Sequence, residues 1–161
     1  MTRWAATIVE PGESFRVIMA VCVILGGGVL KGAAVATHVT GAFDVKLTPQ
    51  ATDNSAEGPA LGRMSIDKTY HGDLEATGKG EMLTAGSSVK DSGVYVAVER
   101  VAGTLQGRRG TFALHHRGVM TRGVPQLAIS VVPDSGTGQF VGLFGTMTIN
   151  IVDGMHFYEF D

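Results

Sequence analysis

Apolar and polar residues alternate with a period of two along most of the chain from Thr37 onward. Clusters of Gly, Asp, Ser and Pro separate the alternating runs, and no long stretch repeats its apolar residues every 3.6 positions, as an amphipathic helix does. Alternating runs bounded by turn-forming residues are typical of half-buried β-strands. We therefore expect an all-β domain over residues 37–161.

The alternation predicts eight strands, which are enough to close a small antiparallel barrel. Two polar segments, residues 49–59 and 84–93, predict loops because they are rich in turn-forming residues. The expected strands cover residues 38–47, 63–71, 74–84, 93–105, 110–119, 126–132, 146–152 and 156–160, with a further short strand at 139–143.

Glycine makes up 23 of the 161 residues, about twice its average share, which indicates many tight turns. Residues 103–114 and 138–149 share the pattern G-x-Φ-x-G-x-x-G-T-Φ-x-Φ, where Φ is apolar. Because glycine adopts the positive φ that tight hairpin turns need, this pattern predicts two similar hairpins. The strand predicted at 74–84 also carries Gly78 and Gly80 on one face, which favours a curved strand and leaves space inside the barrel.

Residues 1–36 differ from the rest of the chain because they contain an apolar run of 14 residues, 17–30. A helix needs about 20 apolar residues to span a bilayer, whereas the apolar part of a secretory signal needs about 7–15. Ala34-Val35-Ala36 fits the small-residue pattern of a cleavage site. We expect an exported protein whose mature chain begins near Thr37, with a cytoplasmic location as the alternative. Membrane contact is expected only through residues 1–36, if they stay uncleaved.

The formal net charge of −2 argues against a nucleic-acid partner, because such proteins carry an excess of positive charge. The lone cysteine, Cys22, lies in the N-terminal segment, so residues 37–161 hold no cysteine for a disulfide. The adjacent His115 and His116 are a weak metal signal, because neighbouring strand residues point to opposite faces. We expect no metal and no cofactor.

Four segments of the predicted barrel carry a resemblance to a known family. They are Gly41-Ala-Phe-Asp-Val-Lys, Gly72-Asp-Leu-Glu-Ala-Thr-Gly-Lys-Gly-Glu-Met-Leu, Tyr95-Val-Ala-Val-Glu-Arg-Val-Ala-Gly-Thr-Leu-Gln-Gly-Arg and Asp153-Gly-Met-His-Phe-Tyr-Glu-Phe. The stretch from about His38 to Phe160 resembles the bacterial domain of unknown function 3224 family. The resemblance implies a small antiparallel barrel similar to that of allene oxide cyclase, and it implies no established activity. No residue matches the cyclase's catalytic set by motif, and likeness of fold alone transfers no function.

Glu99 and His116 form the candidate catalytic pair. A hairpin that turns at Gly107 and Arg108 places Glu99 directly opposite His116 on the neighbouring strand. A carboxylate beside an imidazole holds it in one tautomer and favours its protonated form, as a general acid or base requires. The competing interpretation is a structural cross-strand pair that stabilises the sheet.

Four aromatic or imidazole side chains are candidates for binding a ligand inside the barrel, because small-molecule pockets are lined mainly by such groups. The alternative is that they belong to an ordinary apolar core, where strand aromatics are common. The candidates are Tyr95, Phe112, His156 and Tyr158.

Three functions are compatible with these features. The first is binding of a small apolar or amphipathic molecule in the barrel, since eight-stranded barrels can hold one small ligand. The second is a cofactor-independent cyclase or isomerase that transfers a proton through Glu99 and His116. The third is a structural or homo-oligomer-forming module whose barrel is filled by its own side chains.

Overall fold

A computed structural model describes residues 37–52 and 58–161. The apolar segment at 1–36, on which the export prediction depends, lies outside the described residues. No helix in the described part of the chain is long and apolar enough to cross a bilayer. The strands are β1 (Val39–Gln50), β2 (Leu61–Gly72), β3 (Leu74–Gly86), β4 (Gly93–Leu105), β5 (Arg108–Thr121), β6 (Val124–Val131), β7 (Met147–Val152) and β8 (Met155–Phe160), with one 3-10 helix, η1 (Gly138–Phe140), between β6 and β7.

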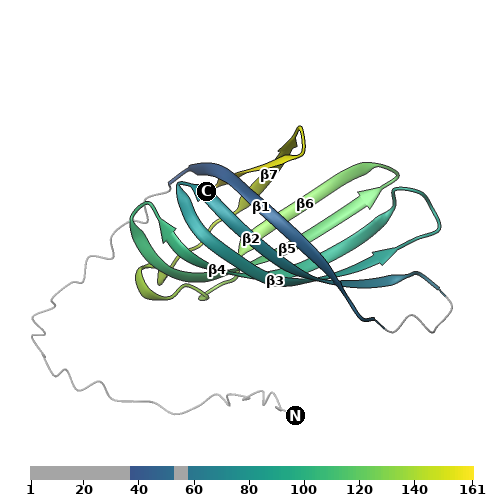
Figure 1. Cartoon of the computed structure of the whole chain (residues 1–161), viewed down its shortest axis with the longest axis horizontal. Coiled ribbons are helices and arrows are strands. Elements are labelled where there is room, and N and C mark those ends of the chain that lie inside the picture. Colours follow the sequence, from purple (N-terminus) through teal and green to yellow (C-terminus); the bar gives the residue numbers. More distant parts are fainter. Residues whose placement is uncertain (1–36, 53–57) are drawn as a thin grey trace, which may run out of the picture. The chain divides into compact units, whose positions relative to one another are not determined.

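These strands form one sheet in the order β6-β5-β4-β3-β2-β1-β8-β7, and all neighbouring strands are antiparallel (Figure 1). The two outermost strands meet at a bridge between Ser130 and Thr146, beside a hydrogen bond of 3.0 Å that Val131 N donates to Gly145 O. The sheet therefore curls into a nearly closed barrel, which confirms the predicted all-β fold class.

Glycines let neighbouring strands approach closely as the sheet curls. A Cβ atom on Gly80 would overlap the Val98 carbonyl oxygen, and one on Gly103 would overlap Ala76 on the adjacent strand. Only a residue without a side chain fits at these positions, as glycine inside a strand indicates. The eight main strands lie where the alternation predicts them, with ends that differ by no more than three residues.

The short strand predicted at 139–143 and the second predicted hairpin are wrong. Residues Gly138–Phe140 form a 3-10 helix instead. Gly138 and Gly142 have φ of 59° and 81°, which lie outside the region that strands use. The buried Phe140 ring packs edge-on against Phe112, with ring centroids 5.7 Å apart, so this segment joins the core instead of extending the sheet.

The inward side chains fill one end of the barrel, here called the closed end. The opposite end, where the β3–β4 loop and the β5–β6 turn lie, is here called the open end (Figure 1). There Leu47, Met120 and Leu127 face inward but remain 45%, 39% and 43% exposed. The core cluster comprises Val39, Phe43, Tyr70, Leu74, Ala76, Val101, Leu105, Phe112, Leu114, Ile129, Val131, Phe140, Met147, Tyr158 and Phe160.

Candidate functional site

The β4–β5 hairpin positions Glu99 and His116. Its two-residue turn consists of Gln106 and Gly107, with φ of 47° and 77°. Positive φ at both central residues is typical of the type I′ turn, whose twist matches that of a tight hairpin. This turn begins one residue earlier than the one predicted at Gly107 and Arg108.

The earlier turn changes which residues face each other: Glu99 pairs with Leu114, and His116 pairs with Ala97. The direct pairing predicted for Glu99 and His116 is therefore wrong. The register has shifted by two residues, which leaves both side chains on the same face of the sheet. Both point into the barrel, where His116 Nε2 lies 3.3 Å from Glu99 Oε2. Diagonal neighbours on one face are within reach of long side chains.

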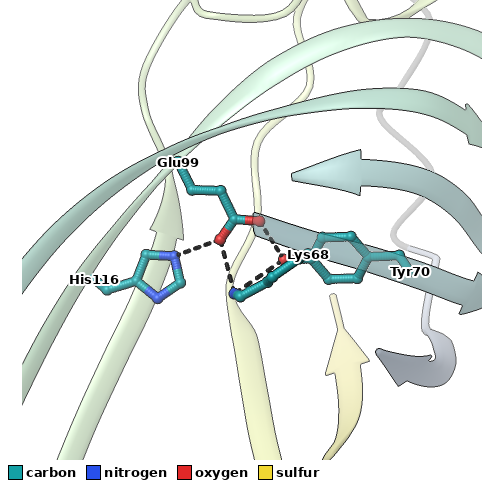
Figure 2. A network of polar contacts seen from close by, with 4 residues as sticks. All are labelled: Lys68, Tyr70, Glu99 and His116. Atoms are coloured by element: carbon teal, nitrogen blue, oxygen red, sulfur yellow. Dashed lines mark hydrogen bonds and ion pairs between the residues drawn. The ribbon is translucent and has the colours of Figure 1, made fainter. Parts of the chain in front are cut away.

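Glu99 is the centre of a buried quartet that also contains Lys68, Tyr70 and His116 (Figure 2). Lys68 Nζ donates to Glu99 Oε2 at 2.7 Å, and the Tyr70 hydroxyl donates to Oε1 at 2.8 Å. Lys68 Nζ also donates to the Tyr70 hydroxyl at 3.2 Å. The Glu99 carboxylate is completely shielded from solvent. A buried ion pair is tolerated only when such hydrogen bonds satisfy both ions.

Gly78 provides the room for the Glu99 carboxylate. It lies on the inward face of β3, where it pairs with Lys68 of β2 and Val101 of β4. A Cβ atom at this position would overlap Glu99 Oε1. The space that the small residues of β3 leave inside the barrel is therefore occupied, at Gly78, by the side chain of Glu99.

The contacts of the quartet determine the charge of Glu99. Burial raises the pKa of its carboxyl, but the neighbouring His116, Lys68 and Tyr70 lower it more, so the pKa lies below its ordinary value. Glu99 is therefore an anion at neutral pH. Burial and the Glu99 charge raise the pKa of Tyr70, which keeps its hydroxyl protonated as a donor. Lys68 Nζ also lies 4.7 Å from the centre of the Phe43 ring, a cation–π contact.

His116 is the member of the quartet whose polar atoms are not satisfied. Its side chain is 5% exposed. Although Nε2 lies close to Glu99, it is the one buried side-chain nitrogen or oxygen in the described residues without an aligned hydrogen bond. The other ring nitrogen, Nδ1, lies on the side turned away from Glu99, and no described residue hydrogen-bonds to it (Figure 2). An unsatisfied buried polar group of this kind is uncommon in folded proteins.

Tyr95 is the candidate binding residue that lies at the open end. It pairs with Gly118, two residues from His116 on the same inward face. The half-buried Tyr95 ring lies over Gly118, where a Cβ atom would overlap it. Burial raises the pKa of Tyr95, so its hydroxyl is neutral, and no described residue hydrogen-bonds to that hydroxyl. Tyr95, Gly118, Met120 and Leu127 help to line a groove of about 390 Å³.

The structure does not bring the other predicted binding residues to this groove. Phe112 and Tyr158 are each 1% exposed and belong to the closed-end core. The Tyr158 hydroxyl accepts a hydrogen bond of 2.9 Å from Leu74 N, which anchors its ring in that core. His156 is half-buried, with its ring 5.0 Å from that of Phe43. In the part of the chain described, no three potential ligands gather as a metal site would require.

Sequence reasoning missed Lys68 and Tyr70. Both lie on the inward face of β2, together with the buried Ile66. A lysine at an inward position between two apolar residues of an alternating strand signals a charged group in the core, which needs a partner. That signal was present in the sequence, but the partner lies two strands away and no local spacing indicates it.

Two comparisons relate the chain to known proteins. The profile of a family described as "Protein of unknown function (DUF3224)" matches residues 39–161. A solved structure from Shewanella oneidensis MR-1, described as a protein with unknown function from the DUF3224 family, is 54% identical to this chain. The match covers 77% of this chain and 93% of that chain, with a TM-score of 0.74. Comparison with curated proteins gives no match. By sequence profile and by structure, the chain belongs to the DUF3224 family.

Proposed function

We propose that the open end of the barrel binds a small molecule with an apolar body and a polar group that hydrogen-bonds to His116. The observation that carries this proposal is the buried His116 ring, whose two nitrogens lack aligned hydrogen bonds to the described residues. Ligand sites typically combine apolar walls with a few polar groups that fix orientation. The Tyr95 hydroxyl, on the same inward face, is a second such group.

The apolar walls are inward side chains that the barrel leaves partly exposed. Met64 and Met82 are half-buried, and Met120 and Leu127 are 39% and 43% exposed. Methionine side chains adapt to irregular shapes, which makes them suitable for contacts with an apolar ligand. A bound molecule in this region removes their apolar surface from water, which favours binding.

Binding of the uncharged dye Nile red tests the proposed location, because its fluorescence rises in an apolar site. Leu127→Glu places a charge at the open end and is expected to weaken dye binding about tenfold or more, a loss of at least ~1.4 kcal/mol. Val98→Glu is the matched control, since Val98 is exposed on the outer face of β4. Loss of binding in Val98→Glu alone, or no binding by the wild type, would contradict the proposal.

A second candidate function is proton transfer by His116, and the observation that favours it is the contact with Glu99. If the carboxylate holds the proton on Nε2, Nδ1 is free to remove a proton from a bound substrate. The Glu99 charge then stabilises the imidazolium that forms. Incubating the wild type, His116→Gln and Glu99→Gln with apolar ketones in D₂O tests this. Protein-dependent deuterium incorporation beside the carbonyl, lost in both variants, is expected, and equal incorporation by all three proteins would exclude the role.

A third candidate is a self-associating module, and an exposed apolar surface favours it. Leu83, Val96 and Val98 are 55%, 50% and 60% exposed on the outer faces of β3 and β4. They line a depression of about 620 Å³ that also includes Arg63 and Arg117. Exposed apolar patches often mark protein contacts. Sedimentation analysis of the wild type and Val96→Glu tests this: a dimer that dissociates in the variant supports it, and a monomeric wild type contradicts it.

A further inference from the structure

The charges of the buried quartet constrain which polar group His116 binds. Lys68 carries a positive charge and Glu99 a negative one, and their contact at 2.7 Å leaves this pair neutral overall. A further net charge in this shielded region is costly unless an opposite charge accompanies it. The bound state therefore pairs either an uncharged group with neutral His116 or an anion with the His116 cation.

The hydrogen-bonding capacity of His116 distinguishes the two states. Neutral imidazole has one N–H, so it cannot donate both to Glu99 and to a ligand. The imidazolium has two, and it can donate from Nε2 to Glu99 while Nδ1 donates to the ligand. The protonated Tyr95 hydroxyl supplies another donor on the same inward face of the sheet. Two donors on one face favour an acceptor that carries negative charge.

We infer that the polar group of the ligand is a carboxylate, and that its binding is coupled to the uptake of one proton by His116. This inference rests on the proposed binding function and specifies its ligand as an apolar monocarboxylate. The apolar chain lies among the inward side chains of the open end. The carboxylate accepts hydrogen bonds from His116 Nδ1 and the Tyr95 hydroxyl.

Among the groups on the strands around the site, His116 is the one that takes up the proton. β4 contributes Glu99 and Tyr95 to its surroundings, and β2 contributes Lys68 and Tyr70. The inward residues of β6 next to it are apolar, and those of β3 are Gly80, Met82 and Thr84. On β5 itself, His115 and Arg117 point to the outer face. β8 supplies His156, whose ring contacts Phe43, and this histidine serves as the control.

Calorimetry with decanoate and its uncharged analogue decanol tests the inference. Titrations at pH 6, 7 and 8 use two buffers that differ in ionisation enthalpy, so the difference in measured heat counts the protons taken up. For decanoate we expect proton uptake on binding, and affinity that falls as pH rises, by up to about tenfold per pH unit. At pH 6 decanol is expected to bind more weakly than decanoate, and its affinity is not expected to fall as pH rises.

The variants His116→Gln and His156→Gln test which of the two histidines takes up the proton. His116→Gln is expected to lose the pH dependence for decanoate, and its cooperative urea unfolding shows that the barrel is folded. His156→Gln keeps the wild-type behaviour. If decanol and decanoate both bind without proton uptake, the inference is overturned while the proposed binding function stands. If neither binds, the proposed function itself fails.

Discussion

At the residue scale, the buried charge of Glu99 connects the two parts of the candidate site. Its carboxylate holds Lys68 and Tyr70 on one side and lies beside His116 on the other. Glu99 and His116 could be identified from sequence because they belong to one hairpin, whose turn limits the register. Lys68 and Tyr70 could not be assigned as their partners, because contacts between strands distant in sequence depend on how the whole sheet curls.

Removal of the Lys68 charge leaves Glu99 buried without its cationic partner. We expect Lys68→Met to lower the free energy of unfolding by about 3–5 kcal/mol. The double variant Lys68→Met/Glu99→Gln removes both charges, so its loss is smaller than the sum of the two single losses. Urea unfolding of the four proteins measures this. Losses that add within error would show that the two side chains do not stabilise each other.

The lowered pKa of Glu99 also predicts how stability depends on pH. In the unfolded chain the Glu99 carboxyl has its ordinary pKa of 4.5, whereas in the folded protein its pKa is lower. Protonation of Glu99 therefore favours unfolding as the pH falls below 4.5. The contribution of Glu99 to stability is complete above pH 4.5 and is lost as the pH falls through the folded pKa. Urea unfolding from pH 6 to pH 3 is therefore expected to show a steeper loss for the wild type than for Glu99→Gln. Parallel curves would contradict the assigned charge.

At the element scale, local sequence determines the strands better than the loops. The alternation predicts all eight main strands, because apolar residues at every second position indicate which face of a strand is buried. The repeated glycine pattern did not determine its loops. Around Gly107 it forms a two-residue hairpin turn, whereas its second copy begins with the 3-10 helix Gly138–Phe140, which buries Phe140. Glycine permits several turn conformations, and the packing of Phe140 selects one that the pattern does not encode.

Gly78 tests the close fit between β3 and the quartet. We expect Gly78→Ala to destabilise the fold by about 1–3 kcal/mol, because the new methyl group overlaps the Glu99 carboxylate. Gly86→Ala is the matched control on the same strand, since a Cβ atom there meets no other atom within 4 Å. It is expected to change stability by no more than about 0.5 kcal/mol. Equal effects of the two substitutions in thermal or urea unfolding would show that the space at Gly78 is not needed.

At the scale of the whole molecule, the barrel has a packed closed end and an open end with exposed inward side chains. The number of strands and their alternation predicted a barrel, but not which end is filled. That difference depends on the sparse pairing of β6 with β7 and on Phe140, which packs against Phe112 at the closed end. Both are contacts between distant parts of the chain, so the alternation of apolar and polar residues does not predict them.

NMR mapping of decanoate binding tests the central claim, that the open end is a ligand site whose polar contact is His116. Titration of the isotope-labelled full chain at pH 6 reports which side chains the ligand approaches. We expect shift changes at Tyr95, His116 and Leu127, and no comparable changes at Phe112 in the closed end or at Val98 on the outer face. Changes confined to the outer face or the closed end, or no changes at saturating ligand, would contradict it.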